Sequence, residues 1–202
     1  TAIGFRDYML MLLLYSTAVR INELLTLKIC NIAIDCAKPH IIVIGKGRKK
    51  RPVPLLAKPV QYLKKYLTEY HPNPGDAEAL LFSSKSRGIY TPMSAENVNK
   101  MLKKYAKMAH GKCCDVPLDI HAHQFRHAKA SHWLENGMNI AQISYLLGHE
   151  NIQTTMVYLD ITTEQEEKAL ETLEDENQRC VGKKWKSAKG KMELEVFLGL
   201  YK

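Results

Sequence analysis

The sequence predicts a mainly α-helical domain that carries a small antiparallel three-stranded β-sheet. Of its 202 residues, 46% are hydrophobic, which is enough for one sizeable core. Most apolar residues recur at helical spacing, but residues 31–55 change to the period of two that is typical of strands. The longest apolar run, residues 8–15, is much shorter than the roughly 20 residues that cross a bilayer, so we expect no membrane partner.

Two helices and the sheet are expected in the first part of the chain. Residues 5–17 are apolar on nearly every face, which is typical of a helix buried at the centre of a domain. Ser16 and Thr17 interrupt this run and can cap a second helix, which begins at Arg20. The expected strands are residues 31–35, 41–45 and 51–55, and a basic turn at residues 46–50 precedes the last strand.

Helical spacing returns after the sheet, first over residues 60–70 and then over 95–110, with Ser94 as the cap of the later helix. The intervening segment 83–92 is expected to be a loop. The remaining helices are expected at residues 123–136, 139–147, 151–159 and 164–177, with Gly137, Gly148 and a capping box of Thr163 and Glu166 as boundary signals. We therefore expect a main domain at residues 1–161 and a C-terminal tail at 162–202, made of a helix and a linker.

The charge balance favours a polyanionic partner. Lys and Arg number 29 against 21 Asp and Glu, which gives a net charge of +8. Judged by charge alone, nucleic acid is the first candidate and a membrane surface the second. The five cysteines are an odd number without a CxxC pair, which is typical of reduced thiols inside a cell, so a cytoplasmic location is expected.

Two arginines occupy positions that call for a negative partner. Arg126 shares one helical face with His123, His127 and apolar residues further along. An unpaired buried charge is too costly to keep, so its partner is either an internal carboxylate or a phosphate, which the guanidinium fork matches. Arg20 raises the same question, because Glu23 on its own helical face can either neutralise it or hold it in place for a ligand. Two such arginines from distant helices favour the phosphate.

Tyr158 is a further candidate. In residues 151–159 the apolar stripe is formed by Ile152, Met156 and Leu159, and Tyr158 is expected off this stripe, on a polar flank beside Thr155. A tyrosine used for packing would lie in the stripe itself. Its hydroxyl is therefore a candidate for function, with an ordinary surface tyrosine as the alternative.

These segments have two alternative interpretations. His123 and His127 have the spacing of a helical zinc pair, but the Glu of an HExxH motif is missing and Arg126 would lie beside the cation, so no metal is expected. Residues 139–159 resemble a helix-turn-helix with Gly148 in the turn. A DNA-binding module without catalytic activity is therefore the alternative class.

Taken together, four segments resemble the sequence boxes of the tyrosine recombinase catalytic domain, as found in phage integrases and Xer-type enzymes. They are STAVRINELLTL, VIGKGRKKRPVPL, HQFRH and LGHENIQTTMVY, in the order of the family, and the resemblance extends from about residue 5 to residue 160. The chain departs from the family where TAVR replaces the commoner Thr-Gly-Leu-Arg and where Phe125 replaces the usual Leu. Both departures concern packing and remove no reacting group.

The resemblance implies the tyrosine recombinase catalytic-domain fold and a DNA strand-transferase activity through a 3′-phosphotyrosine intermediate. It implies the following catalytic residues: Tyr158 as nucleophile, Arg20 and Arg126 as phosphate clamps, Lys46 as general acid for the leaving 5′ oxygen, His123 as acid/base, and His149 as a further donor to the phosphate. The basic turn adds four residues that are expected to contact DNA: Arg48, Lys49, Lys50 and Arg51.

The family also implies double-stranded DNA as partner and a homotetramer on paired DNA sites. The tail 162–202 is expected either to dock on a neighbouring subunit or to pack on its own domain. No cofactor is required, because the phosphotyrosine retains the energy of the phosphodiester. A type IB topoisomerase-like relaxation of DNA is the nearest alternative function, followed by a DNA-binding protein of the same fold that does not cut.

Overall fold

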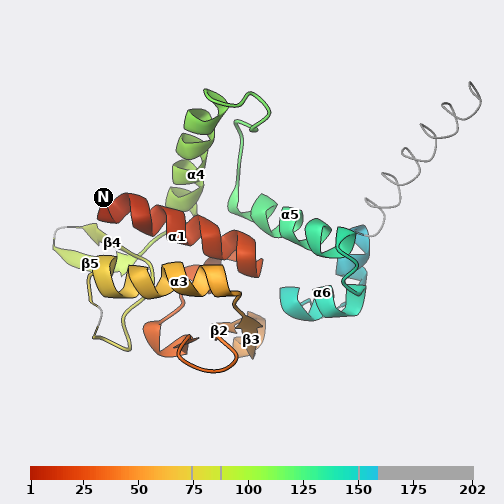
Figure 1. Ribbon diagram of the computed structural model, residues 1–202, viewed down its shortest axis with the longest axis horizontal. Coiled ribbons are helices and arrows are strands. Elements are labelled where there is room, and N and C mark those ends of the chain that lie inside the picture. The colour runs from red at the N-terminus through yellow and green to blue at the C-terminus, as the bar shows by residue number, and fades with distance from the viewer. Residues whose placement is uncertain (74, 87, 150, 159–202) are drawn as a thin grey trace, which may run out of the picture. The chain divides into compact units, whose positions relative to one another are not determined.

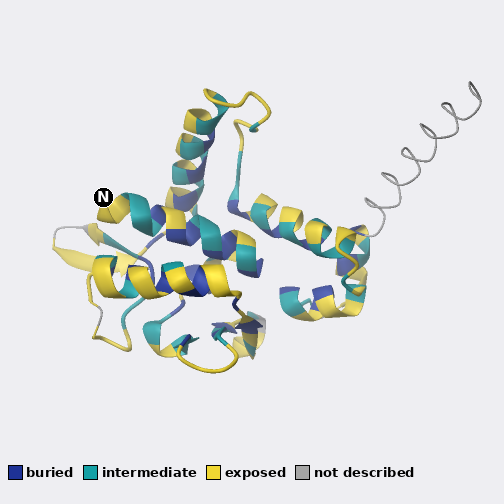
Figure 2. Cartoon of the chain, in the orientation of Figure 1, coloured by how far each residue is buried: buried dark blue, intermediate teal, exposed yellow. Residues whose placement is uncertain are grey.

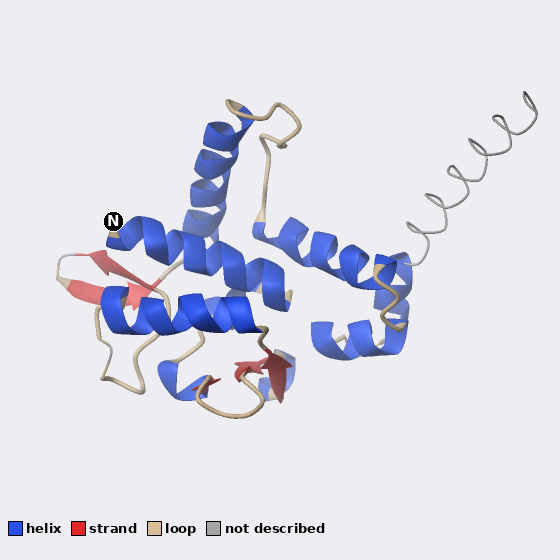
Figure 3. Ribbon diagram, viewed as in Figure 1, coloured by secondary structure: helices blue, strands red, loops and turns tan. Residues whose placement is uncertain are grey.

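The computed structural model describes residues 1–73, 75–86, 88–149 and 151–158, which all lie in the unit Thr1–Leu159. Helices dominate it (Figures 1 and 3). They are α1 (Ala2–Thr17), α2 (Ile21–Leu25), α3 (Ala57–Lys65), α4 (Ala95–His110), α5 (Ala122–Glu135) and α6 (Ile140–Leu147), with the shorter turns η1 (Ile29–Asn31), η2 (Lys46–Arg48) and η3 (Tyr66–Tyr70). Residues 153–158 are also helical. The predicted helix 164–177 lies outside the described residues.

The predicted three-stranded sheet is confirmed. Its strands are β1 (Ile32–Ala33), β2 (His40–Ile44) and β3 (Lys50–Pro54), which pair antiparallel in the order β1-β2-β3. Ile41 lies opposite Val53, and both are buried, as is Val43 two positions along β2. This alternation fixes the register, because a slip of one residue would turn the apolar side chains to solvent. The fixed register places η2 at the tip of the β2–β3 hairpin.

The expectation of a loop at residues 83–92 is wrong. The segment is a second hairpin, in which β4 (Ser83–Ser86) pairs antiparallel with β5 (Ile89–Pro92) around Gly88, whose φ is 85°. All four residues of β5 are exposed, so the segment lacks the alternation of apolar and polar residues that reveals a strand packed on a core. Backbone pairing and a left-handed glycine hold this hairpin instead.

The expected cap of α2 is also wrong. Ser16 and Thr17 belong to α1, and the Thr17 hydroxyl donates to the Leu13 carbonyl at 2.6 Å. Helix α1 ends at Ala18, which has the left-handed φ of 51°. Arg20 is itself the N-cap of α2, and its backbone N–H donates to the Glu23 carboxylate at 3.0 Å. The chain therefore turns sharply just before Arg20, and this turn aims the Arg20 side chain.

Two clusters of buried residues hold the fold together (Figure 2). The larger one is built on α1, whose Met9, Leu10 and Leu13 are fully buried, and includes residues of α2, the sheet, α3 and α4. The smaller cluster joins the end of α1 to α5 and α6 and consists of Ala18, Ala130, Ile143, Leu147 and Tyr158. Among the described residues, no helix combines the length and apolar character needed to cross a membrane.

Candidate active site

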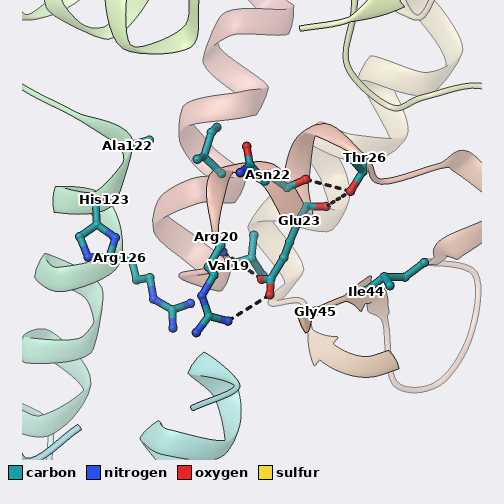
Figure 4. A pocket seen from close by; sticks show the side chains of 11 residues that line it. Val19, Arg20, Asn22, Glu23, Thr26, Ile44, Gly45, Ala122, His123 and Arg126 are labelled. Atoms are coloured by element: carbon teal, nitrogen blue, oxygen red, sulfur yellow. Dashed lines mark hydrogen bonds and ion pairs between the residues drawn. The ribbon is translucent and has the colours of Figure 1, made fainter. Parts of the chain in front are cut away.

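A cavity of about 580 Å³ lies where α2, the end of β2 and α5 meet. Its lining includes Arg20, Glu23, Gly45, His123 and Arg126. Figure 4 shows that the two guanidinium groups reach the cavity from different helices, Arg20 from the start of α2 and Arg126 from α5. The structure therefore brings together the two arginines that the sequence singled out.

Arg126 is almost completely buried, with 2% of its surface exposed. Its guanidinium donates to the Ala18 carbonyl at 2.7 Å and to the Leu147 carbonyl at 2.8 Å, and it contacts His149 Nε2 at 2.9 Å. Within the described part of the chain, these hydrogen-bond partners are all neutral. Burial, followed by the charge of Arg20, lowers the pKa of Arg126 to about 10, so the group still carries its charge at pH 7.

Arg20 is held differently, because its partner is a carboxylate. Its Nη1 donates to Glu23 Oε1 at 3.2 Å, and the Glu23 side chain also receives two hydrogen bonds from Arg51, at 2.9 and 2.8 Å. Burial alone would raise the pKa of Glu23, but the hydrogen bonds from Arg51 and from the Arg20 backbone outweigh it and lower that pKa. Glu23 therefore stays ionised between two arginines, so it both neutralises Arg20 in part and holds it in place.

Arg51 connects the β2–β3 hairpin to the end of α6. Besides its two bonds to Glu23, its Nε donates to the Leu146 carbonyl at 3.4 Å. Gly148, the C-cap of α6, has a φ of 65°, and a Cβ atom at this position would lie 2.7 Å from the guanidinium carbon of Arg51. Only glycine fits both the backbone conformation and this close approach.

His149 is fixed through both ring nitrogens. Arginine is always a donor, so His149 Nε2 accepts from Arg126, and the proton resides on Nδ1, which donates to the Thr155 hydroxyl at 2.8 Å. Burial and then the charge of Arg126 lower the pKa of His149 to about 4, which keeps the ring neutral. Donation from Nε2 to a phosphate would require a proton on Nε2, through the opposite tautomer or a protonated ring.

The predicted orientation of Tyr158 is wrong. Tyr158 is only 3% exposed and belongs to the smaller core cluster, whereas Ile152, from the predicted apolar stripe, is 43% exposed. The buried face of residues 153–158 is instead formed by Thr155 and Tyr158. A threonine can occupy this face because its hydroxyl is satisfied by His149, and hydrophobic periodicity cannot detect that compensation. Burial raises the pKa of Tyr158.

Two histidines of α5 have different neighbours. His123 lines the cavity together with the two arginines. His127, one helical turn after His123, has its Nδ1 2.9 Å from the Tyr158 hydroxyl. The two imidazole rings meet edge to face, with centroids 4.3 Å apart. The sequence placed His127 on the same helical face as Arg126 but gave it no role. The i, i+4 spacing of the two histidines was visible, but nothing in it indicates which ring meets the tyrosine.

The basic turn lies beside the cavity. Lys46 is in η2, directly after Gly45 of the cavity wall, but its side chain lies outside the described part of the structure. Arg48, Lys49 and Lys50 are exposed at the hairpin tip. A second cavity of about 630 Å³ is lined by Lys49 and Lys50 and shares Arg20 and Gly45 with the first. Arg51 differs from these three residues, because its guanidinium is committed to Glu23.

The described residues contain no group of three or more His, Cys, Asp or Glu side chains that could hold a metal ion. They do contain a pair of arginines at one cavity with neutral imidazoles beside them. The buried Tyr158 hydroxyl is hydrogen-bonded to His127, the residue after Arg126. Arginine forks match the oxygens of a phosphate or carboxylate. Fold and site together define an α-helical protein with a cavity suited to an anionic group and a buried tyrosine hydroxyl nearby.

The chain belongs to the phage integrase family, which matches residues 1–165. It is 34% identical over 168 residues to a tyrosine recombinase of Pseudothermotoga lettingae, a match that covers 83% of this chain and 54% of that protein. It is 35% identical over 169 residues to the tyrosine recombinase XerA of Pyrococcus horikoshii, with coverages of 83% and 55%. The chain thus spans about half the length of the curated relatives that it matches.

Solved structures agree on the fold. The crystal structure of a XerA recombinase is similar with a TM-score of 0.61 at 27% identity, over 76% of this chain and 51% of that one. The XerH site-specific recombinase, in a post-cleavage complex with its difH substrate, is similar with a TM-score of 0.68 at 24% identity, over 86% of this chain and 47% of that one. The predicted fold class, a mainly α tyrosine recombinase catalytic domain with a small sheet, is therefore confirmed.

Proposed function

We propose that this chain is the catalytic part of a site-specific recombinase that cleaves and rejoins double-stranded DNA through a 3′-phosphotyrosine intermediate. The observation that carries the proposal is the convergence of Arg20 and Arg126 on one cavity. The Tyr158 hydroxyl is hydrogen-bonded to His127, which follows Arg126 in α5. A DNA phosphodiester fits paired guanidinium donors, and a net charge of +8 suits a polyanionic substrate. The names of the relatives support the same activity.

In the proposed reaction, Arg20 and Arg126 bind the non-bridging oxygens of the scissile phosphate. The Tyr158 oxygen bonds to phosphorus, the bond from phosphorus to the 5′ oxygen breaks, and negative charge grows on the oxygens that the arginines contact. The new phosphotyrosine ester retains the energy of the broken bond, so a 5′ hydroxyl can reverse the step without a cofactor. His123, on the cavity wall, is the group placed to exchange a proton with a substrate oxygen.

His149 acts in this proposal mainly through Arg126. Its Nε2 accepts from the Arg126 guanidinium and its Nδ1 is tied to Thr155, so the ring orients the arginine before DNA arrives. When a phosphate takes over that guanidinium, Nε2 is released and can take a proton to become a donor. The role of a further phosphate donor therefore depends on substrate binding.

Lys46 is assigned the protonation of the leaving 5′ oxygen, because it follows Gly45 of the cavity wall at the tip of the hairpin. Lys46→Ala should lose cleavage of a normal duplex but recover it on a substrate whose 5′ bridging oxygen is replaced by sulfur, since a thiolate leaves without a proton. If sulfur gives no recovery while the duplex still binds, the general acid is another residue.

The central test is formation of a covalent adduct. Wild-type protein is incubated with nicked duplexes that carry a candidate site, and denaturing electrophoresis detects DNA attached to protein. Tyr158→Phe should give no adduct and bind DNA with nearly unchanged affinity, because it removes one hydroxyl. Tyr90→Phe is the control, since Tyr90 is 41% exposed on β5 and lines neither cavity that contains Arg20.

Three other results would reject the proposal. An adduct at the wild-type level in Tyr158→Phe would reject the nucleophile. Site-independent relaxation of supercoiled plasmid, without recombination, would identify a type IB topoisomerase-like activity. Tight binding without any adduct would identify a DNA-binding protein that does not cut.

The assembly is proposed to be a homotetramer on paired DNA sites. We propose the boundary between catalytic domain and tail at residue 161, close to the end of the unit Thr1–Leu159. The tail 162–202 lies outside the described residues. If it acts between subunits, its deletion should spare cleavage of a single site but abolish assembly on paired sites and strand exchange. Sedimentation on paired-site DNA would measure this, and unchanged assemblies with recombination retained would reject the role between subunits.

A further inference from the structure

No step of the proposed reaction uses the contact between His127 and Tyr158. Nδ1 of His127 lies 2.9 Å from the Tyr158 oxygen, and the two rings lie 5.5 Å apart with an angle of 53° between their planes. His127 comes from α5 and Tyr158 from residues 153–158, so tertiary packing and not local sequence makes this contact. The distance is that of a good O–H···N hydrogen bond, along which a proton can move.

The surroundings favour one direction for this hydrogen bond. The charged and titratable groups that face His127 among the described residues are His123 and Arg126 of its own helix and Tyr158 from residues 153–158. Partial burial, followed by the charge of Arg126, lowers the pKa of His127, so the ring is neutral at pH 7 and one of its nitrogens is an acceptor. Burial raises the pKa of the Tyr158 phenol, so its oxygen keeps its proton and can donate it. The resting arrangement that suits both groups is a phenol O–H directed at a neutral Nδ1.

A buried phenol needs such a partner in order to react. Even an unperturbed tyrosine has a pKa near 10, so unaided ionisation at pH 7 costs roughly 4 kcal/mol, and the raised pKa of Tyr158 increases this cost. His123 is less well placed for the task, because it lines the phosphate cavity and contacts the His127 ring by its edge. The two histidines thus face different oxygens, His123 those of the substrate and His127 that of the nucleophile.

We propose that His127 is a catalytic residue that takes the phenolic proton of Tyr158 during cleavage and returns it during rejoining. As the Tyr158 oxygen bonds to phosphorus, the proton passes to His127 Nδ1, the bond to the 5′ oxygen breaks, and that oxygen is protonated by the general acid. Rejoining runs the same transfers backwards, so the protons balance over the cycle. This inference rests on the proposed recombinase function.

The chain offers a matched control on the same helix. His132 Nδ1 lies 2.8 Å from the hydroxyl of Tyr15, with the same atoms and nearly the same distance as in the pair His127–Tyr158. Tyr15 is 36% exposed, and neither His132 nor Tyr15 lines the two cavities that contain Arg20. Any general effect of removing a His–Tyr hydrogen bond from α5 should therefore appear in both pairs.

The test compares His127→Asn with His132→Asn in single-turnover adduct formation on a nicked duplex. The Asn oxygen can still accept a hydrogen bond but cannot carry away a proton. We expect cleavage to slow about 100-fold or more in His127→Asn, because general base catalysis typically contributes 10²- to 10⁴-fold, and to be unchanged in His132→Asn. The wild-type rate should fall on acidification below the usual histidine pKa, as His127 becomes protonated, and this loss should be smaller in His127→Asn. Added imidazole should partly restore cleavage by His127→Ala.

The possible results separate this inference from the function on which it rests. If wild type forms the adduct and His127→Asn cleaves within about threefold of it with the same pH profile, His127 is not the base and the recombinase function stands. Faster cleavage by His127→Asn would also overturn the inference and make the contact a restraint on the nucleophile. If wild type and all variants bind DNA but form no adduct, the proposed function fails first.

A measurement without DNA tests the contact itself. In ¹⁵N NMR spectra of the free protein, His127 should show the tautomer with its proton on Nε2, and Tyr158→Phe should raise the pKa of His127 by removing the bond that favours the neutral ring. His127 is exposed and Tyr158→Phe removes only a hydroxyl, so these variants are expected to fold. A proton on Nδ1 in the wild-type protein would overturn the inference without any knowledge of the DNA site.

Discussion

Arg126 and Arg20 line the same cavity but are held in opposite ways. Arg126 is 2% exposed, and its guanidinium is oriented by two carbonyl oxygens and an imidazole. The Arg20 side chain is 44% exposed and is paired with the carboxylate of Glu23. Neutral acceptors fix the direction of Arg126 without cancelling its charge, whereas Glu23 cancels part of the charge of Arg20.

The difference indicates which arginine provides the fixed part of the site. The Ala18 carbonyl that receives Arg126 belongs to a residue with a left-handed backbone, a conformation that costs about 1 kcal/mol or more outside glycine. Burial of the guanidinium adds a desolvation cost, which is visible as its lowered pKa. An incoming anion would offset this cost. The protein therefore buries one cation among neutral acceptors and leaves the other half exposed, where a carboxylate holds it.

The largest expected effect is on cleavage. Arg126→Ala and Arg20→Ala should each slow adduct formation by about 10³-fold, because each removes a charge-assisted contact that strengthens as the phosphorane forms. The two should differ in urea denaturation. Arg126→Ala should lose about 2 kcal/mol of unfolding free energy, since it leaves buried carbonyls without a donor, and Arg20→Ala less than about 0.5 kcal/mol. Equal losses of stability would contradict the comparison.

Arg51 and Lys50 extend the comparison to the hairpin. Arg51→Ala should lower the free energy of unfolding by about 2 kcal/mol, because it leaves the buried carboxylate of Glu23 with Arg20 alone. Lys50→Ala, at an exposed position, should leave stability unchanged and reduce the slope of log affinity against log salt by up to about 0.9. Arg48→Ala and Lys49→Ala should reduce the salt dependence by a similar amount. Binding at several salt concentrations checks this, and an Arg51→Ala variant that behaves like Lys50→Ala would show that its pairing with Glu23 is unimportant.

A small anion should stabilise the free protein. At a sulfate concentration ten times its dissociation constant, the expected gain is about 1.4 kcal/mol. Thermal unfolding in sulfate and in chloride at equal ionic strength measures this gain. It should be lost in Arg126→Ala and weakened in Arg20→Ala. Equal stabilisation of wild type and Arg126→Ala would mean that sulfate acts elsewhere.

The smallest expected effect is a loss of folding stability at acidic pH. The pKa of His149 is about 4 in the folded protein, below the usual value near 6.5, so the unfolded chain binds more protons between these pH values. Stability should therefore fall as pH drops from about 6.5 to 4. The contribution of this half-buried ring is about 1 kcal/mol or less after solvent screening. Urea denaturation at pH 7 and pH 4.5 should show a smaller acid loss in His149→Asn, and an equal loss would assign the effect to other groups.

Helical and strand periodicity in the sequence was sufficient for most of the architecture. The sheet and the helices α1, α4, α5 and α6 follow from periodicity and from end signals such as Ser94 and Gly148. Periodicity failed where apolar side chains do not mark the buried face. All of β5 is exposed, and the buried face of residues 153–158 includes Thr155 because His149 satisfies its hydroxyl.

The residues of the site were easier to predict than their contacts. Arg20 and Arg126 stood out because a charge at the edge of an apolar stripe needs a partner, and the structure brings both to one cavity. Hydrogen bonds between side chains depend on distances that only tertiary packing sets. Two examples are the hydrogen bond between His127 and Tyr158 and the bidentate pair of Arg51 with Glu23. No local sequence pattern indicates either contact.

The close approach of Arg51 to Gly148 also constrains how this chain can evolve. Any side chain at position 148 would collide with the guanidinium, and a smaller residue at position 51 would leave Glu23 without its two strongest hydrogen bonds. A single substitution at either position is therefore harmful, and replacement of Arg51 alone does not free Gly148, whose backbone remains left-handed. Because neither residue can be replaced alone without harm, lineages that keep the activity should retain both Arg51 and Gly148.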